Sequence, residues 1–571
     1  MYIDEIKRIE NYRNLSGNTI KFENQVNFLI GENNIGKTNI LELINIIFSK
    51  GKFEEDDFYD ITKPIEIELD LKYSDYELGF FESNFDIEDD NKIPLKIRQD
   101  SIDGRIEYYH NTPMLNSTSI SAIRKLNVLY YYSQRLPSKE VDFQKNQGSG
   151  KVLNFLIEYS LSTNKIKEED ILKKEKLDII LESLNNQIDN LNLLSGDDIK
   201  AYINNDSNKI VSRMLELGDK NGRNINNLGE GIQYAFNIVL QILDCIYNAK
   251  KTRSSEEFLE RLVTDSDGNN LFPIFLILDE PEIHQHPYRQ RALIKEINNI
   301  IQNYNKEFLN LLKELFEIDG IVGQIFIATH SPNILLNDYG QFIRVYKESA
   351  NVNIISGCKI ELEDKSYKHL LHNYLYLKEA MFSKGIILVE GDTEFGAMPE
   401  FASRLDVDLD LYGIGIIKLD GADSVRNCMK IYNEFGIKAI ALIDRDKYDN
   451  YSDMENVYFT NKMDFEEDVY DEFSLMDYMN YKKEIGKINS MIGIYKRKGI
   501  KVDGKTFEEK YTEYIITKET EREIMDEIRE DELKHMKSNK DVYNSSLLAK
   551  YVTKVPEAFS KVIEKIKEEV I

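Results

Sequence analysis

Two short apolar runs that stop abruptly at carboxylates stand out in the C-terminal third of the chain. Residues 385–389 lead into Glu390, and residues 439–443 lead into Asp444 and, two positions on, Asp446. Continuous apolar runs of this length are typical of buried strands in a parallel sheet that is covered on both faces. Ligands of open α/β sheets bind beyond the carboxyl ends of the strands. The pattern therefore predicts that Glu390, Asp444 and Asp446 lie together at one edge of such a sheet.

Several carboxylates at one sheet edge repel each other unless a cation lies between them. Gly391 permits a tight turn after Glu390, and Glu394 follows where the next helix should begin. Hard cations such as Mg²⁺, or Mn²⁺ in its place, take oxygen ligands from carboxylates. We interpret Glu390, Glu394, Asp444 and Asp446 as candidate metal ligands. The alternative is an ordinary α/β domain with acidic strand ends, which are common in a chain with 100 Asp and Glu residues.

A glycine-rich loop near the N-terminus lies between a strand-like and a helix-like run. Residues 31–38 have the pattern Gly-x-x-x-x-Gly-Lys-Thr, with the strand-like run 25–30 before them and the helix-like run 39–48 after them. Glycines in this context let backbone N–H groups surround phosphates at a helix N-terminus. Lys37 can then reach the outer phosphates of ATP, while the Thr38 hydroxyl ligates Mg²⁺. The predicted ATP-binding residues of this loop are Asn34, Gly36, Lys37 and Thr38.

Two further strand-like runs end in residues suited to ATP chemistry. Residues 274–278 lead into Asp279 and Glu280, and residues 325–329 lead into His330. We expect Asp279 to hold the Mg²⁺ shell through water and Glu280 to polarise the attacking water. His330 is placed to hydrogen-bond the γ-phosphate. A separate pair, His284 and His286, has no further Cys or His partner, so we assign it to packing of a turn.

The segment between the glycine-rich loop and residues 274–278 supplies weaker candidates. Gly229 and Gly231 precede the apolar helix-like run 234–246, in the manner of a glycine signature that caps a nucleotide. Gln134 follows the strand-like run 126–132 and is a candidate for contact with Mg²⁺ or the attacking water.

Residues 152–217 are helical in pattern and rich in Leu, Ile, Lys and Asn. Their apolar residues repeat with 4-3-4-3 spacing, at Leu177, Leu181, Leu184, Ile188 and Leu191. Such a heptad seam pairs with another helix. The partner helix is either in a second subunit, which makes the insertion a dimerisation element, or in a packed hairpin of the same chain.

Composition narrows the classes of function. The chain has 571 residues, room for two to four domains, and a net charge of −27. This charge argues against broad nonspecific binding of nucleic acid and favours local basic grooves with metal-bridged phosphate contacts. Three scattered cysteines form no zinc pattern and fit a reduced, cytoplasmic setting. No signal peptide and no apolar run of membrane-spanning length is found, so we expect no membrane partner.

The ordered set of motifs resembles the OLD (overcoming lysogenisation defect) family, whose members join an ABC-type ATPase to a C-terminal Toprim nuclease. Residues 280–287 and 329–332 are close to that family's sequence motifs, and Asn11-Tyr12-Arg13 matches its motif near the N-terminus. The resemblance implies an α/β fold with an ABC-type ATPase in residues 1–370 and a Toprim domain with a parallel sheet in residues 371–571. The helical insertions are then residues 152–217 and 474–536.

The same resemblance assigns roles in the Toprim part. Glu390 acts as metal ligand or base, and Asp444 and Asp446 are ligands. Residues 460–466 resemble a segment that supplies another metal-ligating acid, for which we choose Glu466. The segment near the end resembles one that carries a catalytic lysine, which stabilises charge on the scissile phosphate. Lys540 is our choice and Lys537 the alternate.

One position departs from the family's ATPase pattern. Glu230 stands where ABC signatures have a serine that contacts the γ-phosphate bound to a partner subunit. A carboxylate facing a triphosphate is repelled unless it turns away or meets a cation. This puts efficient ATP hydrolysis in doubt more than ATP binding.

The resemblance implies an ATP-regulated, divalent-metal-dependent endonuclease that nicks or cleaves double-stranded DNA in anti-phage defence. Chain length and layout are closest to the nuclease subunit of the Gabija defence system. Expected partners are DNA, further copies of the chain in a dimer or tetramer, and a UvrD-like helicase; retron-associated relatives would instead imply a reverse transcriptase.

Three other classes of protein compete with this interpretation. A type IA topoisomerase needs further domains with a tyrosine nucleophile, and a primase usually carries a Cys-rich zinc module. A non-cleaving DNA clamp of the RecF or SMC kind is the remaining alternative. The intact Glu390, Asp444 and Asp446 argue against the clamp.

Overall fold

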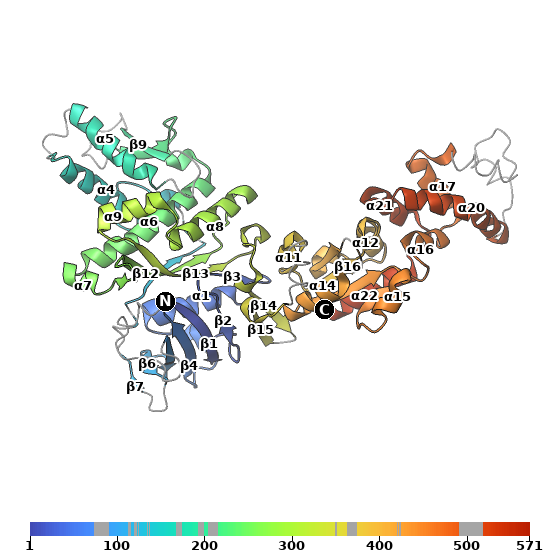
Figure 1. Cartoon of the computed structure of the whole chain (residues 1–571), viewed down its shortest axis with the longest axis horizontal. Helices are drawn as coiled ribbons and strands as arrows, with labels where there is room; N and C mark the ends of the chain where they lie inside the picture. The colour runs from blue at the N-terminus through green and yellow to red at the C-terminus, as the bar shows by residue number, and fades with distance from the viewer. Residues whose placement is uncertain are drawn as a thin grey trace. The chain divides into compact units, whose positions relative to one another are not determined.

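The chain forms two compact units, Met1–Ile360 and Glu361–Ile571 (Figure 1). The boundary between the two domains was predicted after residue 370, whereas the two units divide after Ile360. The computed structural model describes the whole chain except residues 74–90, 112–115, 119–122, 124, 134, 136, 167–173, 192–198, 204–214, 349–350, 363–373, 420, 422–423 and 490–517.

The first unit is organised around a sheet of seven described strands. Along it lie β11 (Val263–Thr264), β12 (Asn270–Asp279), β13 (Gly320–Ala328), β3 (Val26–Ile30), β14 (Phe342–Glu348) and β15 (Asn351–Ser356), and β8 (Asn127–Tyr131) also pairs with β12. The central strands β12, β13 and β3 are parallel. All five residues of β3 are buried; four of them are apolar, and the Asn27 side chain bonds to the backbone of Glu23. Because these strands are parallel and in register, their carboxyl ends bring three loops to one edge of the sheet.

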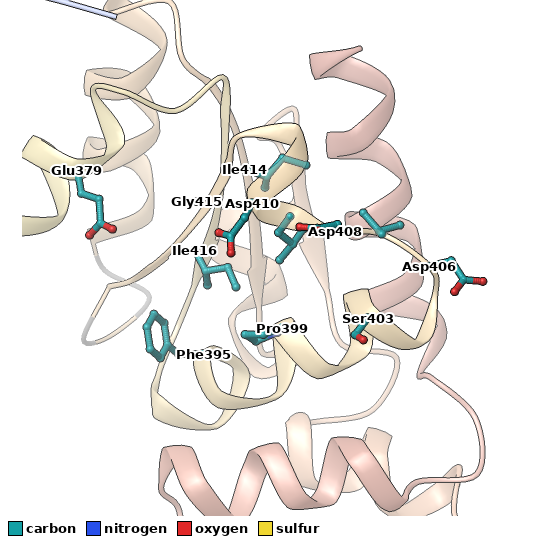
Figure 2. A pocket seen from close by; sticks show the side chains of 12 residues that line it. Glu379, Phe395, Pro399, Ser403, Asp406, Asp408, Asp410, Ile414, Gly415 and Ile416 are labelled. Carbon is teal, nitrogen blue, oxygen red and sulfur yellow. The ribbon is translucent and has the colours of Figure 1, made fainter. Parts of the chain in front are cut away.

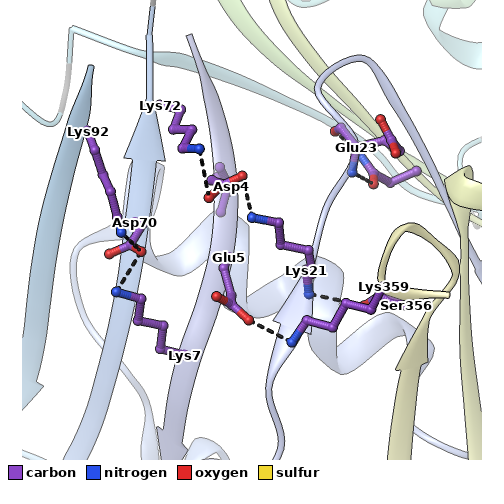
Figure 3. A network of polar contacts seen from close by, with 12 residues as sticks. Asp4, Glu5, Lys7, Lys21, Glu23, Asp70, Lys72, Lys92, Ser356 and Lys359 are labelled. Carbon is purple, nitrogen blue, oxygen red and sulfur yellow. Dashed lines mark hydrogen bonds and ion pairs between the residues drawn. The ribbon is translucent and has the colours of Figure 1, made fainter. Parts of the chain in front are cut away.

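A second, antiparallel sheet in this unit carries buried acids paired with lysines. Its strands follow the order β2 (Ile20–Lys21), β1 (Tyr2–Glu10), β4 (Ile65–Lys72), β5 (Lys92–Gln99), β6 (Glu107–His110) and β7 (Asn116–Ser117). The Asp70 carboxylate is 2% exposed and lies 2.7 Å from Lys7 Nζ and 2.9 Å from Lys92 Nζ (Figure 3). Asp4 is neutralised in the same way by Lys21, at 2.7 Å. These pairs hold β1, β2, β4 and β5 together across the sheet.

Asp70→Asn should lower the free energy of unfolding of the first unit by about 2–3 kcal/mol. Two ammonium groups lose the carboxylate that neutralises them, and breaking a fully buried pair costs about 3–5 kcal/mol. The loss is smaller here because Lys7 and Lys92 remain partly in solvent. Urea denaturation followed by circular dichroism measures the change. Asp100→Asn, at a carboxylate that is 68% exposed, is the control and should cost about 0.5 kcal/mol or less; equal losses would contradict this account.

The helical insertion forms its own small layer. It contains α4 (Ser149–Thr163), α5 (Lys174–Asp189), β9 (Ile199–Ile203) and β10 (Leu215–Asp219). Four residues of the predicted heptad seam are at most 6% exposed, namely Leu177, Leu184, Ile188 and Leu191. Helix α5 packs against α4 and β9 of the same chain. The chain thus covers this seam itself, which corresponds to the packed-hairpin alternative.

The second unit is built on a parallel sheet, and this confirms the predicted α/β class. The strand order is β17 (Ile414–Lys418), β16 (Gly385–Val389), β18 (Lys438–Ile443) and β19 (Val457–Phe459). Helices α12 (Asp392–Arg404) and α22 (Glu557–Val570) cover one face, where Ile387, Val389, Ile440 and Leu442 point. Helix α14 (Val425–Glu434) packs against β18. The apolar runs predicted as buried strands are therefore β16 and β18.

The helices that follow the sheet in this unit include α16 (Phe465–Asp471), α17 (Leu475–Glu484), α20 (Lys518–Ser538) and α21 (Val542–Tyr551). A fully buried ion pair joins two of them, because Lys482 Nζ of α17 lies 2.5 Å from Glu532 Oε2 of α20. The Tyr478 hydroxyl donates to the same oxygen. Within the described part of the chain, none of the helices has the length and apolar character needed to cross a membrane.

Candidate nucleotide and metal sites

The glycine-rich loop has backbone geometry suited to a phosphate. Gly31 and Gly36 have φ angles of 138° and 121°, and Asn34 has a φ of 57°. A Cβ on Gly31 would lie 2.0 Å from the carbonyl oxygen of Val345, so only glycine fits there. Gly36 is followed by α1 (Lys37–Asn45), whose first N–H groups have no helical acceptor. The loop is thus shaped as the cradle that the sequence predicts.

Lys37 is held at the centre of this cradle. Its ammonium group donates to the carbonyl oxygens of Gly31, at 2.9 Å, and Glu32, at 2.6 Å. Burial lowers the pKa of Lys37 to about 8, although the nearby charges of Glu280 and Asp279 oppose the shift. A phosphate entering the loop offers this amine a stronger partner than two carbonyls. The residues present therefore fit the phosphates of a nucleotide.

The carboxyl ends of β12 and β13 place three predicted residues next to Lys37. Burial raises the pKa of Asp279 to about 6, with the charges of Glu280 and Glu282 adding to the shift. Glu280 adopts the left-handed conformation, with a φ of 51°, and its Oε1 lies 3.1 Å from Nε2 of His330. The structure thus brings Asp279, Glu280 and His330 together around the loop.

Glu282 is a residue of this site to which sequence analysis gave no role. Its Oε1 accepts hydrogen bonds from the Thr329 hydroxyl and from the His330 N–H, each at 2.7 Å. The side chain is 9% exposed. It therefore joins the turn after β12 to the end of β13 and sets the position of His330. The sequence does show a further acid, Glu282, three residues after Asp279. Such spacing alone does not indicate which residue it contacts.

A cavity of about 610 Å³ lies beside Thr38 and Asp279. Glu42, Tyr130 and Arg135 also line it. The Tyr130 hydroxyl is buried and has no hydrogen-bond partner among the described residues. No sequence pattern indicated these three residues. Gln134, which was predicted to contact Mg²⁺ or the attacking water, lies outside the described residues.

The glycine signature lies at the start of α6 (Glu230–Lys251), with Gly229 as the preceding residue. Glu230 is the residue that differs from the family's signature. Its Oε2 lies 2.9 Å from Nδ1 of His284, whose ring can carry positive charge. The Gly231 carbonyl oxygen accepts a hydrogen bond from the Gln285 amide at 2.5 Å. The turn after Glu282 is therefore fastened to the signature, and His284 takes part in that contact.

In the second unit, Glu390 and Asp444 lie side by side because they follow the adjacent strands β16 and β18. The backbone N–H of Asp444 donates to Glu390 Oε2 at 3.3 Å, and Asp444 Oδ1 accepts from the N–H of Phe465 at 3.2 Å. Burial raises the pKa of Asp444 to about 8; the charges of Glu394 and Glu390 add to the shift, and Lys540 opposes it.

Glu394 and Glu466 are the buried members of a group of acids at this sheet edge. Glu394 is 3% exposed and accepts from the Gly391 N–H at 2.9 Å, at the start of α12. Glu466 is 1% exposed, and its Oε2 lies 3.0 Å from Nζ of Lys540. Burial raises the pKa of both carboxyl groups. We refer to Glu390, Glu394, Asp444 and Glu466 as the acid cluster.

The two candidate lysines are in different places. Lys540 contacts Glu466, and its charge acts on Asp444 and Glu394. Lys537 instead pairs with Asp464, at 2.6 Å, and Glu467, at 3.0 Å.

Asp446 is placed differently from the other predicted ligands. Its side chain is 46% exposed and lies 3.2 Å from Nζ of Lys447. The residue belongs to a short 3-10 turn, Arg445–Lys447, that follows β18 and has no buried residue.

The acid cluster offers oxygen ligands of the kind that a divalent cation takes. The carboxylate oxygens of Glu466 are buried; Oε2 lies 3.0 Å from Lys540 Nζ, and Oε1 has no hydrogen-bond partner among the described residues. Burial raises the pKa of three members of the cluster, namely Glu394, Asp444 and Glu466. Such a donor set suits a hard cation. In the conformation described, however, no three His, Cys, Asp or Glu side chains of the described residues converge on one point. A cation would draw Glu390 and Glu466 from their present partners.

Two cavities of this unit lie away from the acid cluster. One of about 730 Å³ opens beside the edge strand β17, where Phe395 and Ile416 face it together with the carboxylates of Glu379 and Asp410 (Figure 2). Its lining differs from the acid cluster, which lies at the carboxyl ends of β16 and β18.

Comparison with known proteins gives two family matches. Residues 26–337 match the model described as "AAA domain, putative AbiEii toxin, Type IV TA system". Residues 381–446 match the "Overcoming lysogenization defect protein-like, TOPRIM domain".

Curated relatives match over limited stretches. The Old nuclease of Escherichia phage P2 is 26% identical over 235 residues, which are 40% of this chain and 34% of that protein. RecF of Francisella tularensis is 40% identical over 53 residues, 9% of this chain and 15% of that protein. The chain therefore spans about a third or less of the length of these relatives.

Solved structures are similar at low scores. An SmcHead bound to the C-winged helix domain of ScpA has a TM-score of 0.38 and 15% identity, covering 64% of this chain and all of that one. The C-terminal region of the Burkholderia pseudomallei OLD protein has a TM-score of 0.22 and 16% identity, covering 33% of this chain and all of that one. The assignment therefore rests on the family models. Because the first model spans more than half of the 571 residues, the chain belongs to this AAA-domain family, and it carries in addition a segment that matches the OLD-like TOPRIM domain.

Proposed function

We propose that this protein is an ATP-regulated, divalent-metal-dependent DNA endonuclease that acts in anti-phage defence. The observation that carries the proposal is the acid cluster with Lys540, which lies at the carboxyl ends of β16 and β18 within and beside the segment that matches the Toprim domain. The similarity to Old nuclease supports the same activity. The defence role rests on the resemblance to that family.

The chemistry follows from the charges of the cluster. Buried carboxylates hold divalent cations, which activate water and stabilise the leaving oxygen of a phosphodiester. Glu394, Asp444 and Glu466 are the proposed ligands, and Glu390 is a ligand or the base. Lys540 is positioned to stabilise negative charge on the scissile phosphate. Asp446 remains a proposed ligand that has to turn inward, because it is exposed in the conformation described.

ATP is proposed to regulate this activity from the first unit. An ABC-type site is completed by a second subunit, so Gly229 and Gly231 of one copy cap the nucleotide that Lys37 of another copy holds. The protein should therefore be a homo-oligomer. Because Glu230 stands in the signature and pairs with His284, ATP turnover should be slow, which suits a nucleotide sensor. We expect ATP to inhibit cleavage, as the resemblance to the Gabija subunit implies.

The acid cluster also argues against the alternative function, a non-cleaving DNA clamp. The similarity to RecF covers only 53 residues, whereas a clamp needs no buried acids next to a lysine in its second unit. Such acids are costly to bury without a cation or a catalytic role.

Removal of divalent cations is the direct test of this function. The purified protein should nick supercoiled plasmid DNA with Mg²⁺ or Mn²⁺ and lose this activity completely in excess EDTA, because the acid cluster then lacks its counter-charge. Gel electrophoresis of relaxed and linear plasmid measures the rate. Activity that returns on addition of Mn²⁺ but not of Na⁺ supports the proposal. Cleavage that persists in EDTA contradicts it.

A further inference from the structure

Two loops flank Asp444 and are fastened to each other. One consists of Arg445–Lys447 and α15 (Tyr448–Tyr451) after β18, and the other is residues 460–464 after β19. Thr460 is fully buried, and its hydroxyl accepts from the Arg445 N–H and donates to the Lys462 carbonyl oxygen, both at 2.9 Å. The walls beside the acid cluster are therefore held in place before any ligand binds.

The first loop presents an aromatic ring and a cation to solvent. The Tyr448 side chain is 45% exposed, and its ring rests against Phe459, with centroids 4.9 Å apart and planes at 60°. The Arg445 guanidinium lies 5.5 Å from the centre of the Tyr448 ring. Phe459 belongs to β19, which pairs with β18 and so ties the ring to the sheet that carries Asp444. We call Arg445 and Tyr448, supported by Phe459, the stacking platform.

The place of the stacking platform points to its ligand. Exposed tyrosines are common, but this one follows Asp444 by four residues and is braced by both a ring and a cation. Aromatic side chains with a neighbouring arginine bind single-stranded nucleic acid, since every base has a π-face and every linkage a phosphate. The net charge of −27 makes such a local contact necessary, because the protein as a whole repels a polyanion.

A base can stack on a protein ring only when it has left its own stack. In an intact duplex both faces of each base are covered by neighbouring pairs, and extrusion costs a few kcal/mol. The cost is least for mismatched or unpaired bases. An unpaired base can therefore reach the ring of Tyr448 at a lower cost than a base within an intact duplex.

We propose that Arg445 and Tyr448 stack an unpaired nucleobase adjacent to the phosphate that the acid cluster and Lys540 attack. The substrate class is then DNA with unpaired nucleotides at the cleavage position, whether single-stranded or a locally opened duplex. The cleavage step rests on the proposed nuclease function, whereas base stacking can be measured without it.

The first test compares cleavage of a duplex that contains a two-nucleotide bulge with cleavage of the matched perfect duplex. The wild type should have a KM about tenfold lower for the bulged duplex, the effect of one stacked base. Tyr448→Ala should remove this difference with little change in kcat, and Tyr448→Trp should keep it. Tyr304→Ala, at a tyrosine of the first unit that is 71% exposed, is the matched control and should behave as wild type. An unchanged KM ratio in Tyr448→Ala overturns the proposal.

The second test measures stacking without cleavage. A single-stranded oligonucleotide and a bulged duplex, each with an unpaired 2-aminopurine, should lose fluorescence on binding to the wild type in Ca²⁺ buffer. Tyr448→Ala should abolish this quenching. If no DNA is cleaved under any metal condition but the Tyr448-dependent quenching is observed, the proposed nuclease function is contradicted and the stacking proposal is supported. If the wild type cleaves DNA but quenches neither probe, the platform fails and the nuclease function stands.

Discussion

Asp444→Ala should lower the rate of metal-dependent plasmid nicking by about a thousandfold or more. Asp444 contacts Glu390, and its carboxyl group feels the charges of Glu394 and Glu390, so its loss removes a proposed ligand and part of the charge that holds the cation. Removal of a single group that stabilises charge in a transition state costs about 10²–10³ in rate, and loss of a metal ligand costs at least as much.

The fold should survive this substitution. Burial raises the pKa of Asp444 to about 8, which means that its charged form is unfavourable in the folded protein. Removing the carboxyl group relieves that cost, so the melting temperature should not fall. Asp410→Ala replaces an exposed carboxylate of the same unit and should leave nicking unchanged. Full activity in Asp444→Ala would place the active site elsewhere.

Lys37→Ala should weaken ATP binding by about a hundredfold. The amine now donates to two carbonyls of the glycine-rich loop and is the cation at the centre of the phosphate cradle. A hydrogen bond to a charged group contributes about 1.5–3 kcal/mol, and the second contact adds to this. Titration calorimetry with ATP and with a non-hydrolysable analogue measures the loss. Lys313→Ala, at a lysine that is 61% exposed in the same unit, should bind as wild type.

The same variant tests regulation. Wild-type nicking should fall as ATP or its analogue is added, whereas nicking by Lys37→Ala should not respond to nucleotide. If both proteins give the same flat response, ATP does not control the nuclease. If Lys37→Ala binds ATP with unchanged affinity, the assignment of the glycine-rich loop is wrong.

Local sequence patterns were enough to predict those parts of the two sites that lie on a single strand or loop. The glycine-rich loop needs particular residues in a row, because Gly31 has no room for a Cβ and the amine of Lys37 donates to two carbonyls of its own loop. Likewise, β16 and β18 are continuous apolar runs because both faces of the sheet are covered, so their ends could be predicted residue by residue.

Side chains from separate elements could not be placed from the sequence. Lys537 and Lys540 differ by three residues in a Lys-rich segment, and spacing does not say which one faces Glu466. Lys537 lies in the last turn of α20 and meets the acids of α16, whereas Lys540 follows the end of that helix and reaches the acid cluster. The end of α20, set by packing, decides between them.

The sequence by itself determined the two α/β units, the glycine-rich loop and the strand ends that carry acids, because each depends on residues that are neighbours in the chain. Only the tertiary structure decided that Glu282 holds His330, that Asp446 faces outward, and that the seam on α5 is covered by α4 and β9. These three depend on turns and packing between elements far apart in sequence. Hydrophobic periodicity shows which face of an element is buried, but carries no information about the partner that buries it.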